Sequence, residues 1–509
     1  MLFKLRPSIV TAILVTSIYS QEALAYDAAE VAIDTSKWAA ASTKANHLIA
    51  KLNLTEKASM VTGTANGQCI GNLASIESVG FRGLCLSDGP QGLHLTDIAS
   101  VFPSGLTAAA TWDRDLIARR GAAMGAEFRG KGANVMLGWS MGWSQLGGIF
   151  PRSLSLRVAM QESIRSAQAL GVQACAKHFI GNEQETHRTN EEIGGVDVAA
   201  VSANIDDRTL HELYLWPFAD AVKAGVASLM CSYNRVNMTY SCENSPLLKN
   251  ILREELGFEG YVMTDWFATH SGAHAINSGL DLNMPGFLSE TDFTHSYFGS
   301  HVIWVQEGVD RTTLEADWNS TEVVNQVASI CPGKTVVVTH TGGVNSMPWA
   351  DNENVTAILA AHYPGQESGN SIVDVLWGDV NPATISDAWQ VNFTEGLMID
   401  YRHFDSQETT PLYEFGYGLS YTSFNLSTKL SVRYHDNAKG DVSALSHNSN
   451  KMTPIGGNSD LWSKMIEVDT TVVNTGYMSG ATVVQFYLSY PMNSMPSGTP
   501  IKVLRGFEK

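Results

Sequence analysis

The chain has 509 residues, of which 44% are hydrophobic and 17% charged, and its formal net charge is −18. This composition belongs to a globular protein of several domains and excludes a disordered chain. The acidic balance argues against nucleic acid and anionic membrane surfaces, which attract Lys and Arg, and leaves a small neutral substrate as the expected partner.

The first 25 residues have the pattern of a secretory signal peptide. Lys4 and Arg6 precede an apolar stretch at residues 9–18, and Ala23-Leu24-Ala25 forms a small-residue cleavage site. We therefore expect a mature chain that begins near Tyr26 and is secreted to the extracellular space. No later apolar segment is long enough for a membrane span, and the sequence leaves the oligomeric state open.

In a secreted protein, Asn-X-Ser/Thr sequons can be N-glycosylated. Six are present, and we expect N-glycosylation at some of Asn53, Asn237, Asn319, Asn354, Asn392 and Asn425.

The six cysteines can be interpreted for an oxidising compartment. Cys69 with Cys85, and Cys231 with Cys242, are closely spaced and could each close a small loop. Cys175 and Cys331 are expected to be buried free thiols. No Cys or His spacing is typical of a zinc site, so no metal is expected.

Residues 26–300 alternate helical and strand-like segments. Helical periodicity at residues 113–129 is followed by short apolar runs bounded by Gly or polar residues. These runs lie at residues 133–137, 174–176, 227–231 and 260–263, with helical stretches at 209–224 and 245–256. The alternation predicts a parallel sheet with crossover helices, of the (β/α)8-barrel type.

Polar residues follow the apolar runs directly. They are Lys177-His178, Tyr233-Asn234 and Asp265-Trp266. Functional side chains of barrels come from the carboxyl ends of the strands, so these residues predict a polar pocket able to bind hydroxyl groups. Asp265 could supply one of the two carboxyl groups that glycoside hydrolysis needs, with the Trp266 indole as a platform for a sugar.

Asp265 and a second acidic residue, Asp88, also have plainer interpretations. Asp265 equally suits the N-cap of a helix after a strand. Asp88, in the run Asp88-Gly89-Pro90, could belong to an ordinary turn.

A second α/β block is expected over residues 301–428. It has strand-like segments at 302–305, 335–339 and 355–360 and a helix at 323–329. The last part, residues 429–509, contains segments 466–474 and 481–488 that alternate like antiparallel strands. No internal repeat is present.

Several motifs together carry a resemblance to a known family. They include Leu86-Ser87-Asp88-Gly89-Pro90, Ala176-Lys177-His178-Phe179, Met230-Cys231-Ser232-Tyr233-Asn234 and the runs at residues 210–214, 257–266, 364–370, 413–421 and 504–508. In these runs the chain resembles the fungal β-glucosidases of glycoside hydrolase family 3. The resemblance implies a barrel, an α/β sandwich that closes over it, and a fibronectin type III-like domain.

The resemblance also implies the roles of the site residues. Asp265 would be the nucleophile, with Trp266 beside the sugar. The glucosyl unit would be bound by Asp88, Lys177, His178, Arg188 and Tyr233. Glu307, in a Glu-Gly element after the strand at 302–305, would be the acid/base residue, with Glu367 as the alternative. No metal or organic cofactor is required.

The sequence departs from the family in the length of its later domains. Barrel-like sequence runs to Gly299 and Glu307 follows almost at once, where the family has a linker and the first sandwich strands. We therefore expect an incomplete sandwich at 301–428, and a fibronectin-like domain at 429–509 that is truncated at Lys509.

A further departure lies at residues 143–157. Synonymous codons can be chosen for this stretch that, when read one base later, encode Gly-Arg-Asn-Trp-Glu-Gly-Phe and the rest of the segment that carries the sugar-binding arginine in the family it resembles. We infer a local frameshift or a misplaced splice junction, so Arg152 and Arg157 are not given the sugar-binding role.

Together these features predict a secreted retaining β-glucosidase that hydrolyses terminal non-reducing β-D-glucosyl residues of cellobiose and short β-glucans. Two alternatives stay open. One is another β-glycosidase specificity, such as that of a β-xylosidase. The other is a catalytically impaired product of a damaged gene, because the chain lacks the family's arginine segment and part of its sandwich.

Overall fold

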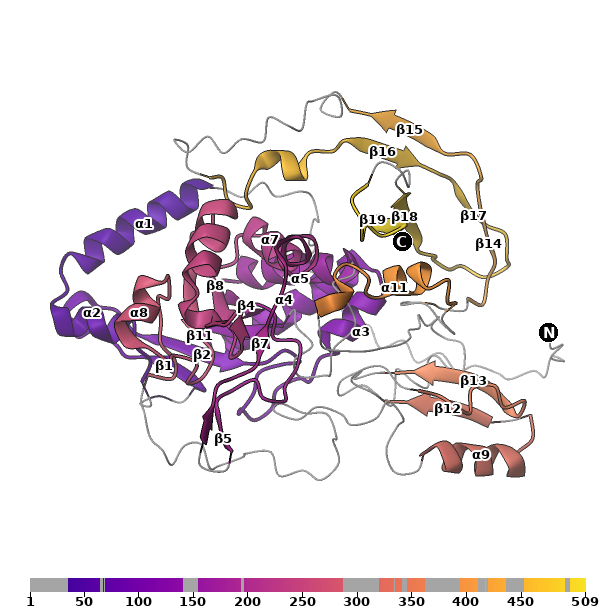
Figure 1. The fold of residues 1–509 in the computed structure, drawn as a ribbon, viewed down its shortest axis with the longest axis horizontal. Helices are drawn as coiled ribbons and strands as arrows, with labels where there is room; N and C mark the ends of the chain where they lie inside the picture. The colour runs from indigo at the N-terminus through magenta and orange to yellow at the C-terminus, as the bar shows by residue number, and fades with distance from the viewer. Residues whose placement is uncertain are drawn as a thin grey trace, which may run out of the picture.

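The structure, a computed structural model, describes most of the chain in several stretches (Figure 1). They are residues 35–64, 67, 69–140, 154–193, 196–286, 320–333, 335–340, 346–361, 393–410, 417, 420–435, 453–489 and 495–509. Several predictions lie outside the described residues: the signal peptide, the strand at 302–305, and residues Arg152, Glu307, Asn319, Glu367 and Asn392.

The main sheet has six strands in the order β1-β2-β3-β4-β8-β11. Their bounds are Gly71–Leu73, Leu84–Asp88, Val135–Ser140, Gln173–Phe179, Ser228–Cys231 and Tyr261–Thr264. Each apolar run expected to be a strand is one. In this sheet β2, β3, β4, β8 and β11 are parallel to one another. Strand β1 pairs with β2 in the antiparallel sense, so the expectation of a purely parallel sheet is wrong at this strand.

Backbone hydrogen bonds continue beyond the two edge strands. The Thr264 amide donates to the Leu282 carbonyl, and the Gly63 amide donates to the Asn283 carbonyl. The Thr64 amide then donates to the carbonyl of Asn72 in β1. The sheet therefore curls, and the segments around residues 62 and 282 link its last strand to its first.

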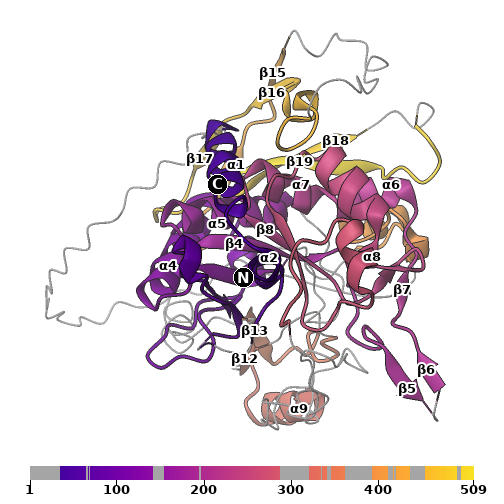
Figure 2. The ribbon, with the colours of Figure 1, turned by 90° about the vertical axis from the view of Figure 1, so that its left-hand side faces the viewer.

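Helices cross between the parallel strands and pack beside them (Figures 1 and 2). They are α3 Gly105–Ala110, α4 Arg114–Gly130, α5 Leu154–Ala169, α6 Asp207–Thr209, η2 Leu210–Tyr214, α7 Trp216–Lys223, η4 Pro246–Glu255 and α8 Gly272–Asn277. The helix expected at 113–129 is α4, and Asp113 caps it by accepting a hydrogen bond from the Leu116 amide. Helix α5 contacts both α4 and α7.

The largest hydrophobic core lies between this sheet and its helices. Phe128 of α4, Phe179 of β4 and Leu248 of η4 are completely buried in it. Phe179 also meets Phe218 of α7 edge to face, with ring centroids 4.9 Å apart. Burial of this kind, at about 25 cal/mol per Å² of apolar surface, is the main source of stability for the sheet that carries the polar strand ends.

Shorter elements surround the sheet. Among them are α1 Thr35–Ile49, α2 Leu54–Met60, η1 Glu77–Val79, β5 Glu191–Ile193, β6 Val196–Val198, β7 Ser202–Ala203, β9 Arg235–Val236, β10 Thr239–Tyr240 and η3 Ser241–Glu243. The hairpin β9–β10 and strand β7 form a small sheet of their own.

The second α/β block is described in part. Helix α9 covers Ser320–Ile330, and strands β12 Thr335–Thr339 and β13 Val355–Ala360 pair in parallel. These three elements are drawn at the lower right of Figure 1 and agree with the helix and two of the strands expected there.

The described residues from 420 onward include three pairs of antiparallel strands. β14 Phe424–Leu426 pairs with β17 Val472–Asn474, β15 Ser431–Tyr434 with β16 Ile466–Asp469, and β18 Val484–Ser489 with β19 Lys502–Glu508. The segment expected as one strand at 466–474 is therefore two strands in two different pairs. Short helices among the described residues after 390 are η6 Phe393–Glu395, α11 Tyr401–Ser406 and η9 Ser459–Trp462.

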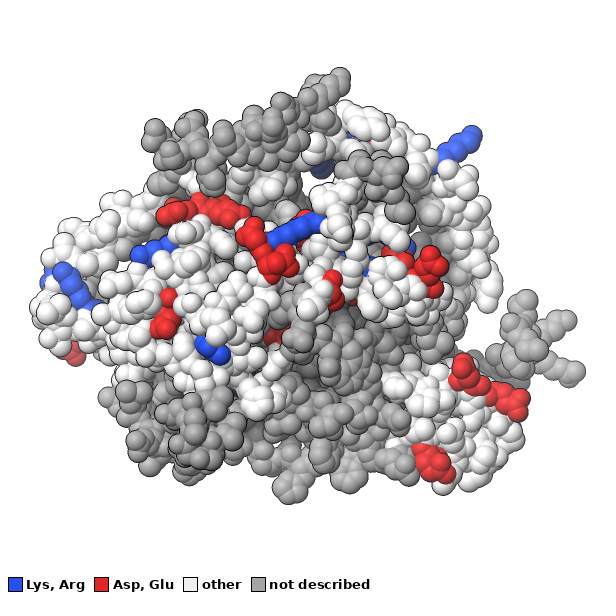
Figure 3. All heavy atoms as spheres, in the orientation of Figure 1, with Lys and Arg blue, Asp and Glu red and all other residues white. Residues whose placement is uncertain are grey.

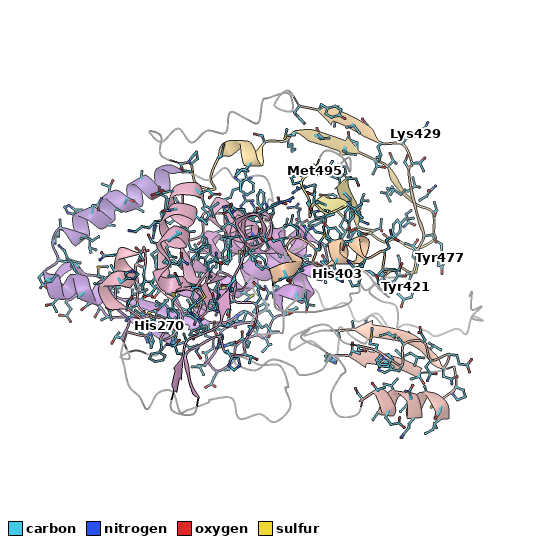
Figure 4. The ribbon with its side chains drawn as sticks, in the orientation of Figure 1. His270, His403, Tyr421, Lys429, Tyr477 and Met495 are labelled. Carbon is cyan, nitrogen blue, oxygen red and sulfur yellow. A yellow bond between two sulfur atoms is a disulfide. The ribbon has the colours of Figure 1, made fainter. Side chains whose placement is uncertain are left out.

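Strand β19 packs on the helices of the main sheet. Phe507 meets the Trp112 indole edge to face at 4.9 Å between centroids, and the Arg114 guanidinium lies 5.0 Å from the Phe507 ring centroid. Tyr421 precedes β14 and Tyr477 follows β17, so both lie at the same end of this antiparallel pair, where they are exposed (Figure 4).

The predicted cysteine pairs form disulfides, Cys69–Cys85 and Cys231–Cys242. Cys175 is a buried free thiol, as expected. The prediction that Cys331 is buried is wrong: it is exposed, because it directly follows the end of α9, whose Ile330 is also exposed.

Described sequons lie at or near the surface. Asn53, Asn237 and Asn425 are exposed and Asn354 is half-buried.

Figure 3 shows acidic and basic side chains interspersed over the described part of one face. Among the described helices none is both long and apolar enough to cross a membrane. Within the same stretches no group of three His, Cys, Asp or Glu side chains is placed to hold a metal ion.

Candidate active site

The carboxyl ends of β2 and β4 meet through an ion pair. Lys177 Nζ donates a hydrogen bond to Asp88 Oδ1 at 2.7 Å. The lysine is 4% exposed. Its burial alone would lower its pKa, but the charges of Asp88 and Asp265 outweigh burial and raise it, so the ammonium stays charged. Asp88 is thus the partner of a buried lysine, and it is the last residue of β2 rather than part of the turn that follows.

The next residue of β4 reaches the end of β11. His178 Nε2 lies 3.2 Å from Asp265 Oδ2, and both residues are buried. Burial, followed by the charges of Lys177 and Arg188, holds the pKa of His178 well below its usual value. The imidazole is therefore neutral at ordinary pH and can donate one hydrogen bond from Nε2 to an oxygen.

Asp265 follows the last residue of β11 and is held by backbone contacts. Its amide donates to the Cys231 carbonyl, and its Oδ1 accepts from the Trp266 amide at 2.8 Å. The alternative of a cap on α8 does not apply, because Ser271 occupies the N-cap position of that helix. A fixed, buried carboxylate beside a neutral imidazole is suited to attack an electrophilic carbon.

Trp266 lies beside this carboxylate, half-buried against the cluster that contains Leu73 and Met284. Its ring also closes over Gly71, where an added Cβ would stand 3.0 Å from the indole. The indole is therefore held in place by the first strand of the sheet, from the opposite edge to β11.

Arg188 and Tyr233 form the third part of the site. The Arg188 guanidinium lies over the Tyr233 ring, 4.5 Å from its centroid. Tyr233 follows β8, and Arg188 comes from the segment after β4. After burial and the charge of Lys177, the positive charge of Arg188 also helps to lower the pKa of His178. The described residues of the predicted site thus gather at or just after the carboxyl ends of β2, β4, β8 and β11.

Two further side chains, which the sequence did not single out, contact residues of the site or the turn beside it. Glu185 Oε2 lies 2.9 Å from Arg188 Nη1. The three-residue spacing between the two charged residues is the feature of the sequence that could have indicated this pair. Arg120, buried in α4, donates to the carbonyls of Pro90 and Pro103, both at 2.7 Å, and so holds the turn after Asp88. Nothing in the sequence distinguished Arg120 from the neighbouring arginines of α4.

Cys175, also on β4, is not a second nucleophile. Burial raises the pKa of its thiol to about 12, so the reactive thiolate is scarce at neutral pH.

Comparisons with known proteins identify the family of the chain. The profile of the glycosyl hydrolase family 3 N-terminal domain matches residues 79–286, and that of the C-terminal domain of the same family matches residues 282–421. The first range contains the described part of the candidate site, from Asp88 to Trp266.

Curated relatives match most of the chain. A probable β-glucosidase G of Aspergillus flavus is 37% identical, over 93% of this chain and 85% of that protein. The corresponding protein of Emericella nidulans is 36% identical with the same coverage. The first alignment spans 703 residues whereas this chain has 509, so the relative contains internal stretches without a counterpart here.

Solved structures resemble the whole described fold. A β-D-glucoside glucohydrolase from Trichoderma reesei has a TM-score of 0.79 at 30% identity, covering 92% of this chain and 91% of that one. A β-glucosidase from Chaetomella raphigera has a TM-score of 0.80 at 31% identity with the same coverage. With a buried carboxylate, lysine and imidazole at one sheet edge, the chain is a glycoside hydrolase and belongs to glycosyl hydrolase family 3.

Proposed function

We propose that this chain is a retaining β-glucosidase that removes terminal, non-reducing β-D-glucosyl residues from cellobiose and short β-glucans. The observation that carries the proposal is the Asp265 carboxylate, buried at the end of β11 with His178 Nε2 at 3.2 Å. The names of the curated relatives, which are probable β-glucosidases, support the choice of glucose.

In the proposed reaction Asp265 attacks the anomeric carbon and the bond to the leaving oxygen breaks. Glu307 donates a proton to that oxygen, and a glycosyl ester of Asp265 remains. Water then attacks the anomeric carbon while Glu307 accepts its proton, which releases glucose and restores the carboxylate. Two displacements retain the configuration, and this requires carboxyl groups about 5–5.5 Å apart.

The substrate hydroxyls would be bound by the polar group around the nucleophile. Asp88 accepts hydrogen bonds, and Lys177, Arg188 and neutral His178 donate them. Trp266 offers an aromatic face to the sugar ring. The attraction between the Lys177 and Asp88 charges, whose atoms lie 2.7 Å apart, offsets part of the desolvation cost of burying the lysine.

The finer organisation is part of the same proposal. Residues 26–300 would form a barrel of the (β/α)8 type, 301–428 an incomplete α/β sandwich that carries Glu307, and 429–509 a fibronectin type III-like domain. The protein would be secreted after loss of residues 1–25 and glycosylated at some of its sequons, of which Asn53, Asn237 and Asn425 are exposed.

The test is covalent labelling. Incubation with a 2-deoxy-2-fluoroglucoside that has a good leaving group should trap the glycosyl ester, and peptide mass spectrometry should locate it on Asp265. Asp265→Asn should prevent both labelling and turnover while the protein stays folded. A label on another carboxylate would overturn the assignment. A panel of nitrophenyl β-glycosides tests the sugar, since faster cleavage of the xyloside would favour a β-xylosidase.

A second candidate is a sugar-binding protein with impaired hydrolysis. It is favoured by one observation, the length of the alignment with the relatives, which exceeds the length of this chain. Side-by-side assays on cellobiose of the chain as printed, and of a chain with the 143–157 frame and the internal stretch restored, separate the two. Equal specific activity would exclude impairment.

A further inference from the structure

Glu185 is a buried carboxylate to which the proposed mechanism gives no role. It is 2% exposed, and its Oε2 lies 2.9 Å from Arg188 Nη1. Arg188 is itself 9% exposed and lies over the Tyr233 ring. The carboxylate and the ring therefore hold the guanidinium from two directions.

The backbone around this pair is fixed as well. The Arg188 amide donates to the Glu185 carbonyl, which closes a turn. Between them His187 has a positive φ of 59°, in the left-handed region that non-glycine residues adopt rarely. The Val201 amide donates to the His187 carbonyl at 2.7 Å, so the turn is tied to the next segment of the chain.

The charge of Glu185 is what makes this arrangement stable. A buried guanidinium without a carboxylate is strongly unfavourable, whereas a paired one has a defined orientation because its N–H groups form a rigid planar fork. A guanidinium fixed in this way is suited to bind hydroxyl groups without losing further side-chain entropy.

We propose that Glu185 is a positioning residue for sugar binding: it fixes the Arg188 guanidinium over Tyr233 so that Arg188 can bind a glucosyl hydroxyl. This inference rests on the proposed function, and it assigns a role to a residue that acts only through Arg188. A merely structural ion pair would affect folding stability but leave sugar affinity unchanged.

The test compares Glu185→Gln with the wild-type full chain. The amide keeps the side-chain size and removes the charge. Glucose affinity is measured by calorimetry, and kcat and KM with nitrophenyl β-glucoside are measured separately. We expect the glucose Kd and the KM to rise by about tenfold with a smaller change in kcat, because an interaction made in both the bound and transition states is weakened.

Glu212→Gln is the matched control. Glu212 accepts from Arg208 at 2.7 Å in an exposed pair on the outer helices, so its loss should leave Kd and KM unchanged. If Glu185→Gln does not fold, Glu185→Asp keeps the charge on a shorter side chain. A folded Glu185→Asp protein should still bind glucose severalfold more weakly than wild type.

Each outcome decides the matter. A folded Glu185→Gln or Glu185→Asp protein with wild-type Kd and KM overturns the positioning role. A wild-type protein that binds glucose without hydrolysing the glucoside sinks the β-glucosidase proposal, while the Kd comparison still decides the role of Glu185. If the wild-type protein neither binds nor hydrolyses, both proposals are wrong.

Discussion

Lys177 Nζ and Asp88 Oδ1 are 2.7 Å apart although their strands, β4 and β2, are separated by β3 in the sheet. The long lysine side chain spans the intervening strand end and neutralises the carboxylate. The lysine is almost fully buried, and burial lowers its pKa, but the charges of Asp88 and Asp265 outweigh burial, so the ammonium remains charged.

Lys177→Met should therefore weaken sugar binding and folding together. The loss leaves Asp88 without its partner, at a cost of roughly 1–3 kcal/mol, towards the lower end because Asp88 is partly exposed. Urea unfolding and the glucose Kd measure the two effects. Lys131→Met is the control, since Lys131 is an exposed lysine that donates to the Asp97 carbonyl. Equal losses in the two variants would contradict this role of Lys177.

His178 should make the protein less stable in acid. Burial, then the charges of Lys177 and Arg188, lowers its folded pKa, so its contribution is complete above the unfolded value near 6.5. As the pH falls below that value, the unfolded state binds a proton that the folded state does not. The free energy of unfolding then falls by up to about 1.4 kcal/mol per pH unit.

His178→Gln should flatten that part of the pH dependence. Urea unfolding of both proteins between about pH 7 and about pH 4 measures it, and the difference between the curves removes the contribution of other groups. Parallel curves for wild type and variant would show that His178 titrates normally in the folded protein.

The two disulfides should stabilise the site as well as the fold. Cys85 lies on β2, three residues before Asp88, and Tyr233 lies inside the loop closed by Cys231 and Cys242. Replacing either pair by Ala should cost about 2–4 kcal/mol, because each disulfide restricts the unfolded chain. The glucose Kd should rise in both variants.

Unfolding in denaturant and calorimetry with glucose check these effects. Cys331→Ser serves as the control, because that free thiol is exposed and should contribute to neither quantity. Unchanged stability of a double variant would indicate that the corresponding disulfide does not form in the protein.

Glu307 is expected to be the acid/base residue. A general acid matters least when the leaving group needs no proton. Glu307→Ala should therefore impair cellobiose cleavage far more than formation of the glycosyl ester from dinitrophenyl glucoside, and azide should restore turnover and yield β-glucosyl azide. The same experiment on Glu367→Ala decides between the two residues: rescue only there would refute Glu307.

Much of the main sheet could be predicted from local sequence. The apolar runs that end before Lys177, Tyr233 and Asp265 are β4, β8 and β11, because short apolar segments flanked by polar residues can bury both faces only inside such a sheet. Placement of these side chains at one edge follows from the parallel direction of the strands, which the alternation with helices implies.

Other features depended on contacts between distant segments. The antiparallel direction of β1 and the division of residues 466–474 between two strand pairs depend on which segments they meet, and periodicity does not specify a partner. Cysteine side chains are usually buried, but Cys331 is exposed. Its exposure could not be inferred because it depends on which segments pack beside it.

The sequence by itself determined which chemical groups are available: the carboxylates, the Lys177-His178 pair and the aromatic residues that follow strands. Only the tertiary structure decided their partners and protonation. Lys177 stays charged because Asp88 and Asp265 approach it, His178 stays neutral because it is buried near two cations, and Glu185 matters because it meets Arg188 away from water. Charge interactions depend on distance and on the surrounding dielectric, and both are properties of the folded chain.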